Sequence, residues 1–144
     1  MTIHRISPTE AQAKLLDGWT YVDVRTPDEF GDGHPAGAIN IPIALSNGGT
    51  MWPNPDFVSV LTAHVGEARK IILGCQSGGR SMRAAQALEK AGFGELFEQR
   101  AGWDGARDAF GQVVEPGWKR AGLPSETGQP EGRSWTSLQG LARK

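Results

Sequence analysis

The sequence predicts an α/β fold with a mostly parallel five-stranded sheet and helices on both faces. Short apolar runs typical of buried strands alternate with segments of helical pattern along the whole chain. Two of those helical segments open with a complete capping signature. At 144 residues the chain suits one domain that buries most of its apolar surface.

The helix starts are the clearest local signals. Ser7–Glu10 and Thr26–Glu29 each supply a hydroxyl N-cap, proline at the first helical position and glutamate at the third, which together form a capping box. Asn54–Phe57 is a looser version of the same pattern. A fourth helix begins at Arg80-Ser81 and ends before Gly92. The predicted helices are therefore 8–16, 27–32, 55–64 and 80–91.

Strands are expected where short apolar runs lie between these helices. Segments 21–25, 38–42 and 70–73 have the composition of buried strands. Segment 95–98 is a weaker candidate, and segment 3–6 is expected at an edge of the sheet. Strands that alternate with helices favour parallel pairing, because each helix carries the chain back across the sheet.

The composition changes near the C-terminal end. Residues 124–130 are rich in proline, glycine, serine, threonine and charge, so we predict a domain over residues 1–124 and a flexible extension over 125–144. Trp135, Leu138 and Leu141 recur at helical spacing within that extension. We expect one or two amphipathic turns that dock on the body, with a partner-binding face as the alternative.

Net charge, the lack of long apolar stretches and the scattered histidines exclude several classes of function. The net charge is -1, which gives no reason to expect a nucleic acid or an anionic membrane as partner. No stretch has the roughly 20 apolar residues of a membrane span, and the first residues lack the apolar core of a secretory signal. His4, His34 and His64 are scattered, and no nucleotide-binding glycine pattern occurs. We therefore expect a cytoplasmic protein without metal or cofactor.

The most informative residue is Cys75, the single cysteine. It follows the apolar run 70–74 and precedes a loop whose end starts a helix. A helix N-terminus presents unpaired N–H groups and a positive dipole end, both of which favour an anion. A thiolate is the nucleophilic form of cysteine, so this position predicts a reactive side chain. The loop residues are Gln76, Ser77, Gly78, Gly79, Arg80 and Ser81.

The residues of that loop suit anion binding. Gly78 and Gly79 lack Cβ atoms, so their backbone can turn N–H groups inward around the sulfur. Arg80 is predicted to present its planar guanidinium to an oxyanion of the substrate. The alternative is an inert buried cysteine, which Gly-Gly-Arg-Ser directly behind it makes the weaker interpretation.

Asp23 and Arg25 end the predicted strand 21–25 and are expected at the same edge of the sheet as Cys75. We predict that they support the loop: Asp23 would accept hydrogen bonds from amides or an arginine, and Arg25 would brace the loop. A plain ion pair at the strand end is the alternative. His34 is interpreted as a structural turn histidine, with service as a base as the alternative.

The chain resembles the rhodanese-like sulfurtransferases from about Ser7 to Pro124. The resemblance rests on Asp23-Val24-Arg25 with Glu29-Phe30 after it, on segment 33–42 and on the loop 75–81. The loop is most similar to single-domain thiosulfate sulfurtransferases. The resemblance implies that Cys75 takes a sulfane sulfur from a donor such as thiosulfate, holds it as a persulfide and passes it by a ping-pong route to a thiophilic acceptor. That acceptor is cyanide or a thiol, including a thiol on a protein.

Two other interpretations of the reactive cysteine stay open. A redox or sulfane-sulfur sensing or binding module would use the same reactive thiol. A phosphatase or arsenate reductase would also place a cysteine before an anion-binding loop, but with six residues from cysteine to arginine and histidine before the cysteine. Here the step is five, and Gly74 precedes Cys75. Many thiosulfate-preferring members also carry basic residues where Gln76, Ser77 and Gly79 are neutral, so another donor stays open.

Overall fold

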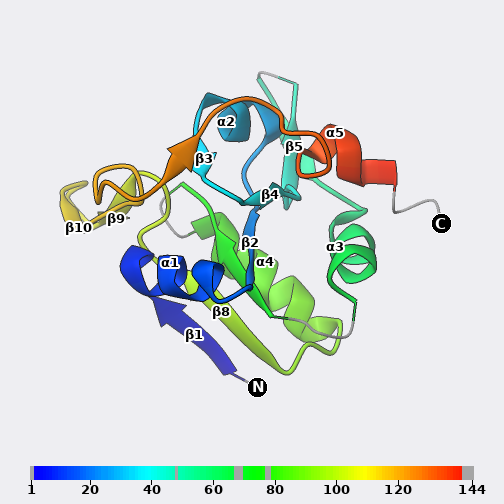
Figure 1. Cartoon of the computed structure of the whole chain (residues 1–144), viewed down its shortest axis with the longest axis horizontal. Coiled ribbons are helices and arrows are strands. Elements are labelled where there is room, and N and C mark those ends of the chain that lie inside the picture. The colour runs from blue at the N-terminus through cyan, green and yellow to red at the C-terminus, as the bar shows by residue number, and fades with distance from the viewer. Residues whose placement is uncertain (1, 48, 67–69, 77–78, 141–144) are drawn as a thin grey trace.

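The computed structural model confirms the predicted α/β class (Figure 1). It describes residues 2–47, 49–66, 70–76 and 79–140. A five-stranded sheet has the order β1-β8-β7-β2-β4, and every pair in it is parallel. Its strands are β1 (Thr2–Ile6), β2 (Thr20–Asp23), β4 (Ile39–Asn40), β7 (Ile71–Gly74) and β8 (Glu95–Gln99). The predicted edge strand, β1, lies at the edge.

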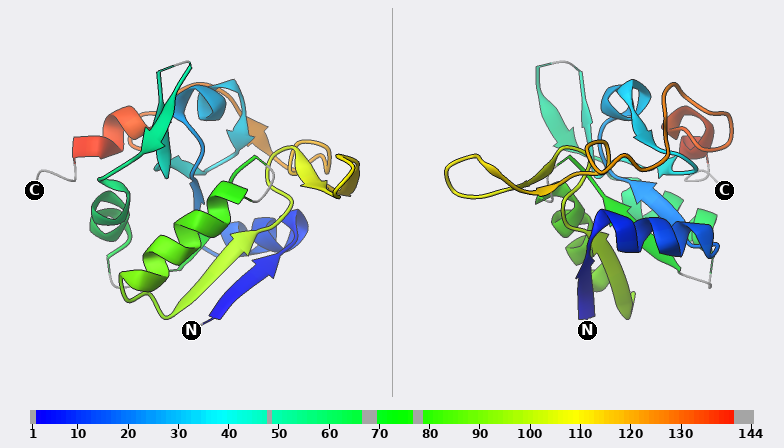
Figure 2. Two further views of the ribbon diagram at one scale, coloured as in Figure 1. Left: turned by 180° about the vertical axis from the view of Figure 1, so that it is seen from behind. Right: turned by 60° about the vertical axis from the view of Figure 1, so that its left-hand side comes forward.

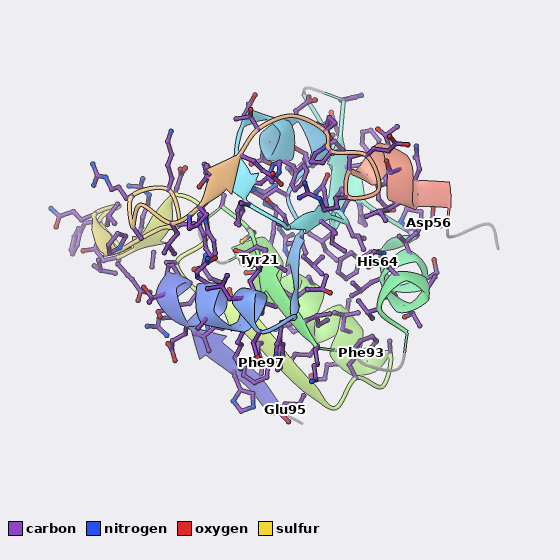
Figure 3. The ribbon with its side chains drawn as sticks, in the orientation of Figure 1. Tyr21, Asp56, His64, Phe93, Glu95 and Phe97 are labelled. Carbon is purple, nitrogen blue, oxygen red and sulfur yellow. The ribbon has the colours of Figure 1, made fainter. Side chains whose placement is uncertain are left out.

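Helices cover both faces of the sheet, and side chains fill the space between (Figure 3). Alternate residues of each strand point to opposite faces, so Val22 and Leu73 join one apolar cluster while Tyr21 and Ile72 join the other. The first face is covered by α3 (Phe57–Val65), α4 (Gly79–Lys90) and α5 (Trp135–Leu138). The second is covered by α1 (Pro8–Leu16) and α2 (Pro27–Asp32).

The capping boxes explain how closely α1 and α2 match their predicted bounds. Ser7 and Thr26 each accept a hydrogen bond from the N–H of the third helical residue, whose glutamate side chain accepts from the N-cap N–H. The looser pattern at 54–57 behaves differently. Asn54 donates to the carbonyl of Pro42 and accepts from the N–H of Asp56, so α3 begins at Phe57, two residues later than predicted.

In the part of the chain that the structure describes, three two-stranded antiparallel pairs accompany the sheet, and the sequence analysis did not predict them. They are β3 (His34–Pro35) with β11 (Ser125–Glu126), β5 (Ala44–Ser46) with β6 (Met51–Pro53), and β9 (Gly105–Arg107) with β10 (Val113–Pro116). The β5–β6 and β9–β10 hairpins project from the body (Figure 2). No helix in the described ranges is long and apolar enough to cross a membrane.

Much of the C-terminal segment packs on the body. Its β11 pairs with β3, and the N–H of Asn40 donates to the carbonyl of Arg133. In α5, Trp135 and Leu138 are buried in the cluster shared with α3 and α4, as expected for turns that dock. Leu141 lies outside the described residues. The domain boundary at residue 124 stays a prediction.

Candidate functional site

Cys75 lies directly after β7, at the carboxyl edge of the sheet, and four residues before α4 begins. This is the edge at which parallel α/β sheets place their ligands. The cysteine is only 3% exposed, and its Sγ lies 3.3 Å from the Oγ of Ser81 in the first turn of α4. The anion-binding loop predicted at Ser77 and Gly78 lies outside the described residues, so that part of the site stays a prediction.

Glu98 is a site residue that the sequence analysis missed. Its side chain is fully buried at the end of β8, where it accepts a 2.5 Å hydrogen bond from the Oγ of Ser81 and a 2.8 Å hydrogen bond from the Nε of Arg5. A hydroxyl has one hydrogen to donate. While Ser81 donates to Glu98, its Oγ can accept a hydrogen bond from the Cys75 thiol, so this arrangement fits the protonated form of Cys75. The hydroxyl would have to rotate toward Sγ before it could donate to a thiolate.

A signal for Glu98 was available. Leu96 and Glu98 are two residues apart in the strand, so they point to the same face, and Leu96 is in the apolar core. A carboxylate on the apolar face of a strand needs hydrogen-bonding partners to be tolerated there. That requirement identifies Glu98 as a member of a polar network, although it does not identify Ser81 as its partner.

Asp23 and Arg25 form a buried ion pair beside the loop. Each is about 2% exposed, and the guanidinium donates to both carboxylate oxygens at 2.7–3.1 Å. The third guanidinium nitrogen of Arg25 donates to the side-chain oxygen of Gln76 at 3.0 Å. The structure therefore brings Asp23, Arg25 and Gln76 together. It contains the strand-end ion pair and also the contact through which Arg25 would brace the loop.

Residues 102–104 fix the backbone at the start of the loop. The N–H of Trp103 donates to the carbonyl of Cys75 at 2.8 Å, and the N–H of Asp104 donates to the carbonyl of Gln76 at 2.9 Å. The side chain of Gln76 also donates to Asp104. Gly102 has a φ of +66°, and a Cβ on it would lie about 2.6 Å from both carbonyl oxygens. Only glycine allows this close approach.

Arg80 is engaged within the protein. Its two terminal nitrogens donate to the two carboxylate oxygens of Glu29 at 2.6 and 2.8 Å, which is the bidentate geometry that favours arginine. The pair ties the first turn of α4 to α2. The sequence analysis expected Arg80 to face a substrate oxyanion; in the structure such an anion would have to share the guanidinium with Glu29.

The Glu29–Arg80 pair predicts a pH dependence of stability. Burial by itself raises the pKa of Glu29, but hydrogen bonds and charge from Arg80, together with hydrogen bonds from Thr26, lower it to about 2. An unfolded glutamate has a pKa of about 4.3. The stabilisation by ionised Glu29 is therefore fully present above about pH 5 and is lost as the pH falls through 2.

We therefore expect the wild-type protein and Glu29→Gln to differ in free energy of unfolding at pH 6 and to converge toward pH 2. Chemical denaturation at a series of pH values measures this difference. Arg80→Ala, which removes the chief partner, should show most of the same loss at pH 6. A difference that does not change with pH would show that the glutamate charge does not stabilise the fold.

His34 has a structural position, as interpreted from the sequence. It is fully buried, with Nδ1 2.6 Å from the carbonyl oxygen of Phe30 and Nε2 3.1 Å from a carboxylate oxygen of Glu126. These contacts link α2, β3 and β11. Within the described residues, no group of three or more histidine, cysteine or acidic side chains is arranged to hold a metal ion.

Comparison with known proteins agrees with this geometry. The Rhodanese-like domain family matches residues 7–109. Thiosulfate sulfurtransferase 16, chloroplastic, of Arabidopsis thaliana is 41% identical over 121 residues, which are 84% of this chain and 91% of that protein. Thiosulfate sulfurtransferase GlpE of Ectopseudomonas mendocina is 31% identical over 125 residues, which are 87% of this chain and 92% of that protein.

A similar solved structure is the crystal structure of Rv0390 from M. tuberculosis. It has a TM-score of 0.64 and 29% identity, and the match covers 87% of this chain and 98% of that one. The family match over residues 7–109 includes the sheet strands β2, β4, β7 and β8, residues 75–81 and helices α1 to α4. The chain therefore belongs to the Rhodanese-like domain family.

Proposed function

We propose that this protein is a sulfurtransferase that moves sulfane sulfur from a donor such as thiosulfate to a thiophilic acceptor through a persulfide on Cys75. The observation that carries the proposal is the position of Cys75, between the carboxyl end of a buried strand and the N-terminus of a twelve-residue helix, in a chain of the Rhodanese-like domain family. Two relatives named thiosulfate sulfurtransferase support thiosulfate as the donor.

The proposed reaction has two steps. The Cys75 thiolate attacks the outer sulfur of thiosulfate, a Cys75 sulfur–sulfur bond forms, the bond within thiosulfate breaks, and sulfite leaves with the electron pair. The acceptor then attacks the outer sulfur of the persulfide and Cys75 returns as a thiolate. With cyanide the product is thiocyanate. The positive dipole end at the start of α4 favours the anionic sulfur in both states.

The proposal fits the residues around the sulfur. A rotation about one bond would turn the Ser81 hydroxyl from Glu98 toward Sγ, where it would donate to a Cys75 thiolate. Thiosulfate-to-cyanide transfer, followed as thiocyanate, tests the activity. Intact-mass measurement after treatment with thiosulfate alone tests the intermediate, which adds one sulfur atom to the chain. Absence of both in the folded protein would contradict the proposal.

We predict that Arg80 acts through Glu29 and positions the loop. Arg80→Ala and Glu29→Gln should then lower the rate of Cys75 modification by a similar factor, about tenfold, both with thiosulfate, which forms the persulfide as sulfite leaves, and with an uncharged organic trisulfide, which forms a mixed trisulfide on Cys75 as a thiolate leaves. The rates are measured from the loss of free Cys75 thiol. A loss confined to thiosulfate in Arg80→Ala, with Glu29→Gln unaffected, would instead show that Arg80 binds the donor anion directly.

The remaining parts of the proposal concern partners and compartment. The partners are small sulfur donors and acceptors and thiols on proteins, and the reaction uses no cofactor. We place the protein in the cytoplasm, where free thiols stay reduced.

A sensor of sulfane sulfur or oxidants is the second candidate function, because Cys75 would be its reactive group as well. Rapid sulfenylation by peroxide without transfer from any sulfur donor would favour the sensor.

A further inference from the structure

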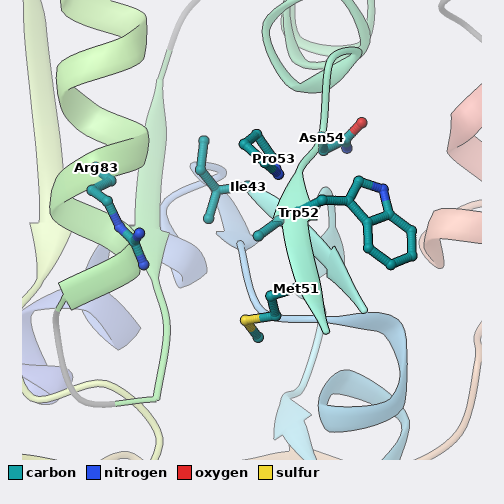
Figure 4. Close-up of a pocket in the computed structure, with 7 residues that line it drawn as sticks. Ile43, Met51, Trp52, Pro53, Asn54 and Arg83 are labelled. Carbon is teal, nitrogen blue, oxygen red and sulfur yellow. The ribbon is translucent and has the colours of Figure 1, made fainter. Parts of the chain in front are cut away.

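We propose that a pocket beside the cysteine loop binds the sulfur acceptor, and that this acceptor is a thiol bearing a carboxylate on an apolar chain. The inference rests on the function proposed above. The pocket has a volume of about 260 Å³ and lies between α4 and the β5–β6 hairpin (Figure 4). Its lining residues are Ile43, Ala44, Met51, Trp52, Pro53, Asn54 and Arg83.

Arg83 supplies an available positive charge. It is exposed on α4, and its guanidinium makes no hydrogen bond or ion pair with the part of the chain that the structure describes. Arg80, one turn earlier on the same helix, is already paired with Glu29. Figure 4 shows Arg83 extending from α4 on the side that faces the hairpin. A guanidinium binds a carboxylate through two parallel hydrogen bonds, so an anionic group complements this end of the pocket.

The opposite wall is apolar. Met51 and Pro53 are two residues apart in β6, so they face the same side, and Trp52 faces the other. Figure 4 shows Met51 and Ile43 between Arg83 and the hairpin, while the Trp52 ring points away. Met51 is 51% exposed, so its side chain is accessible to an apolar ligand. Thiosulfate has no hydrocarbon to cover this wall, whereas an organic ligand does.

The pocket lies within reach of Cys75. The N–H of Val24 donates to the carbonyl of Gly74 at 2.9 Å, and the N–H of Ile43 donates to the carbonyl of Val24 at 3.0 Å. The segment of Val24 therefore lies between Ile43 and Gly74, the residue before Cys75. Two inter-strand spacings separate Ile43 from Gly74, a distance of about 10 Å. Ile43 also packs on the apolar cluster that contains Cys75, so both lie on the same face of the sheet.

The distance between the pocket and Cys75 favours a sulfur acceptor over a sulfur donor as the ligand of the pocket. In thiosulfate the anionic group is bonded to the sulfur under attack, so it must lie next to Cys75. An acceptor thiol can carry its carboxylate several bonds away, with the apolar chain along Ile43 and Met51. Its thiolate attacks the outer sulfur of the Cys75 persulfide, the bond to Cys75 breaks, Cys75 leaves as a thiolate, and the acceptor becomes a hydropersulfide.

The test compares two acceptors of equal length. The protein is loaded with thiosulfate and freed of excess donor, and the persulfide is then discharged with mercaptohexanoate or mercaptohexanol. We expect the carboxylate to react about tenfold faster, because one charge-assisted contact contributes about 1.4 kcal/mol. Arg83→Gln should abolish this preference and leave loading by thiosulfate unchanged. Lys90→Gln, which removes a charge at the far end of α4, should retain it.

Equal preference in the wild-type protein and Arg83→Gln would overturn the inference, as would a defect of Arg83→Gln in the loading step alone. A second measurement tests ligand binding by the pocket independently of sulfur transfer. Calorimetry of hexanoate with Cys75→Ser should show binding that is lost when Arg83→Gln is added. If hexanoate binds but the wild-type protein transfers no sulfur, the pocket is supported and the proposed function is contradicted. If sulfur is transferred but hexanoate does not bind, the proposed function is supported and the pocket is contradicted.

Discussion

Replacing Cys75 with serine is expected to lower thiocyanate formation from thiosulfate and cyanide by at least about a thousandfold, to the background rate. Serine is close in size to cysteine, and its hydroxyl can still meet the Oγ of Ser81, so the fold should be kept. The hydroxyl is not ionised near neutral pH and has no activating base in the described site, so it cannot replace the thiolate as nucleophile. Initial rates and intact mass measure the effect.

A matched variant tests whether position or thiol content matters. Ser59 is exposed on α3, outside the site, so the double variant Cys75→Ser, Ser59→Cys carries one accessible thiol elsewhere. It should be as inactive as Cys75→Ser. Transfer well above background in either variant would contradict a single nucleophile at Cys75. Circular dichroism and the unfolding midpoint confirm that each variant is folded.

Removing the carboxylate of Asp23 is expected to cause the largest loss of stability, about 3–5 kcal/mol in the free energy of unfolding. Asp23→Ala leaves the guanidinium of Arg25 buried without its counter-charge, and it removes the acceptor for the backbone N–H of Arg25. Since Arg25 also contacts Gln76, activity should fall as well. Urea denaturation measures the change in stability.

The control for this prediction is a bidentate ion pair at the surface. Arg100 and Glu115 make hydrogen bonds of 2.9 and 2.8 Å, with side chains 36% and 27% exposed. Glu115→Ala should cost no more than about 1 kcal/mol, because water solvates the arginine that remains. Similar losses for Asp23→Ala and Glu115→Ala would show that burial of the first pair does not determine its contribution.

The sequence predicted the elements that depend on local chemistry. The bounds of α1 and α2 follow from capping boxes, in which partners three residues apart satisfy each other. The five parallel strands follow from apolar runs that need cover on both faces. Short antiparallel pairs such as β3 with β11 join segments about ninety residues apart, and no local pattern specifies such pairing.

The candidate site divides in the same way. The sequence by itself determined that Cys75 ends a strand before a helix, because the apolar run and the glycine loop are contiguous. Only the tertiary structure decided that Glu98 meets Ser81, that Glu29 occupies Arg80 and that Arg83 is left for a pocket with Met51. Long polar side chains choose partners by distance in space, and those distances are fixed by how the helices pack on the sheet.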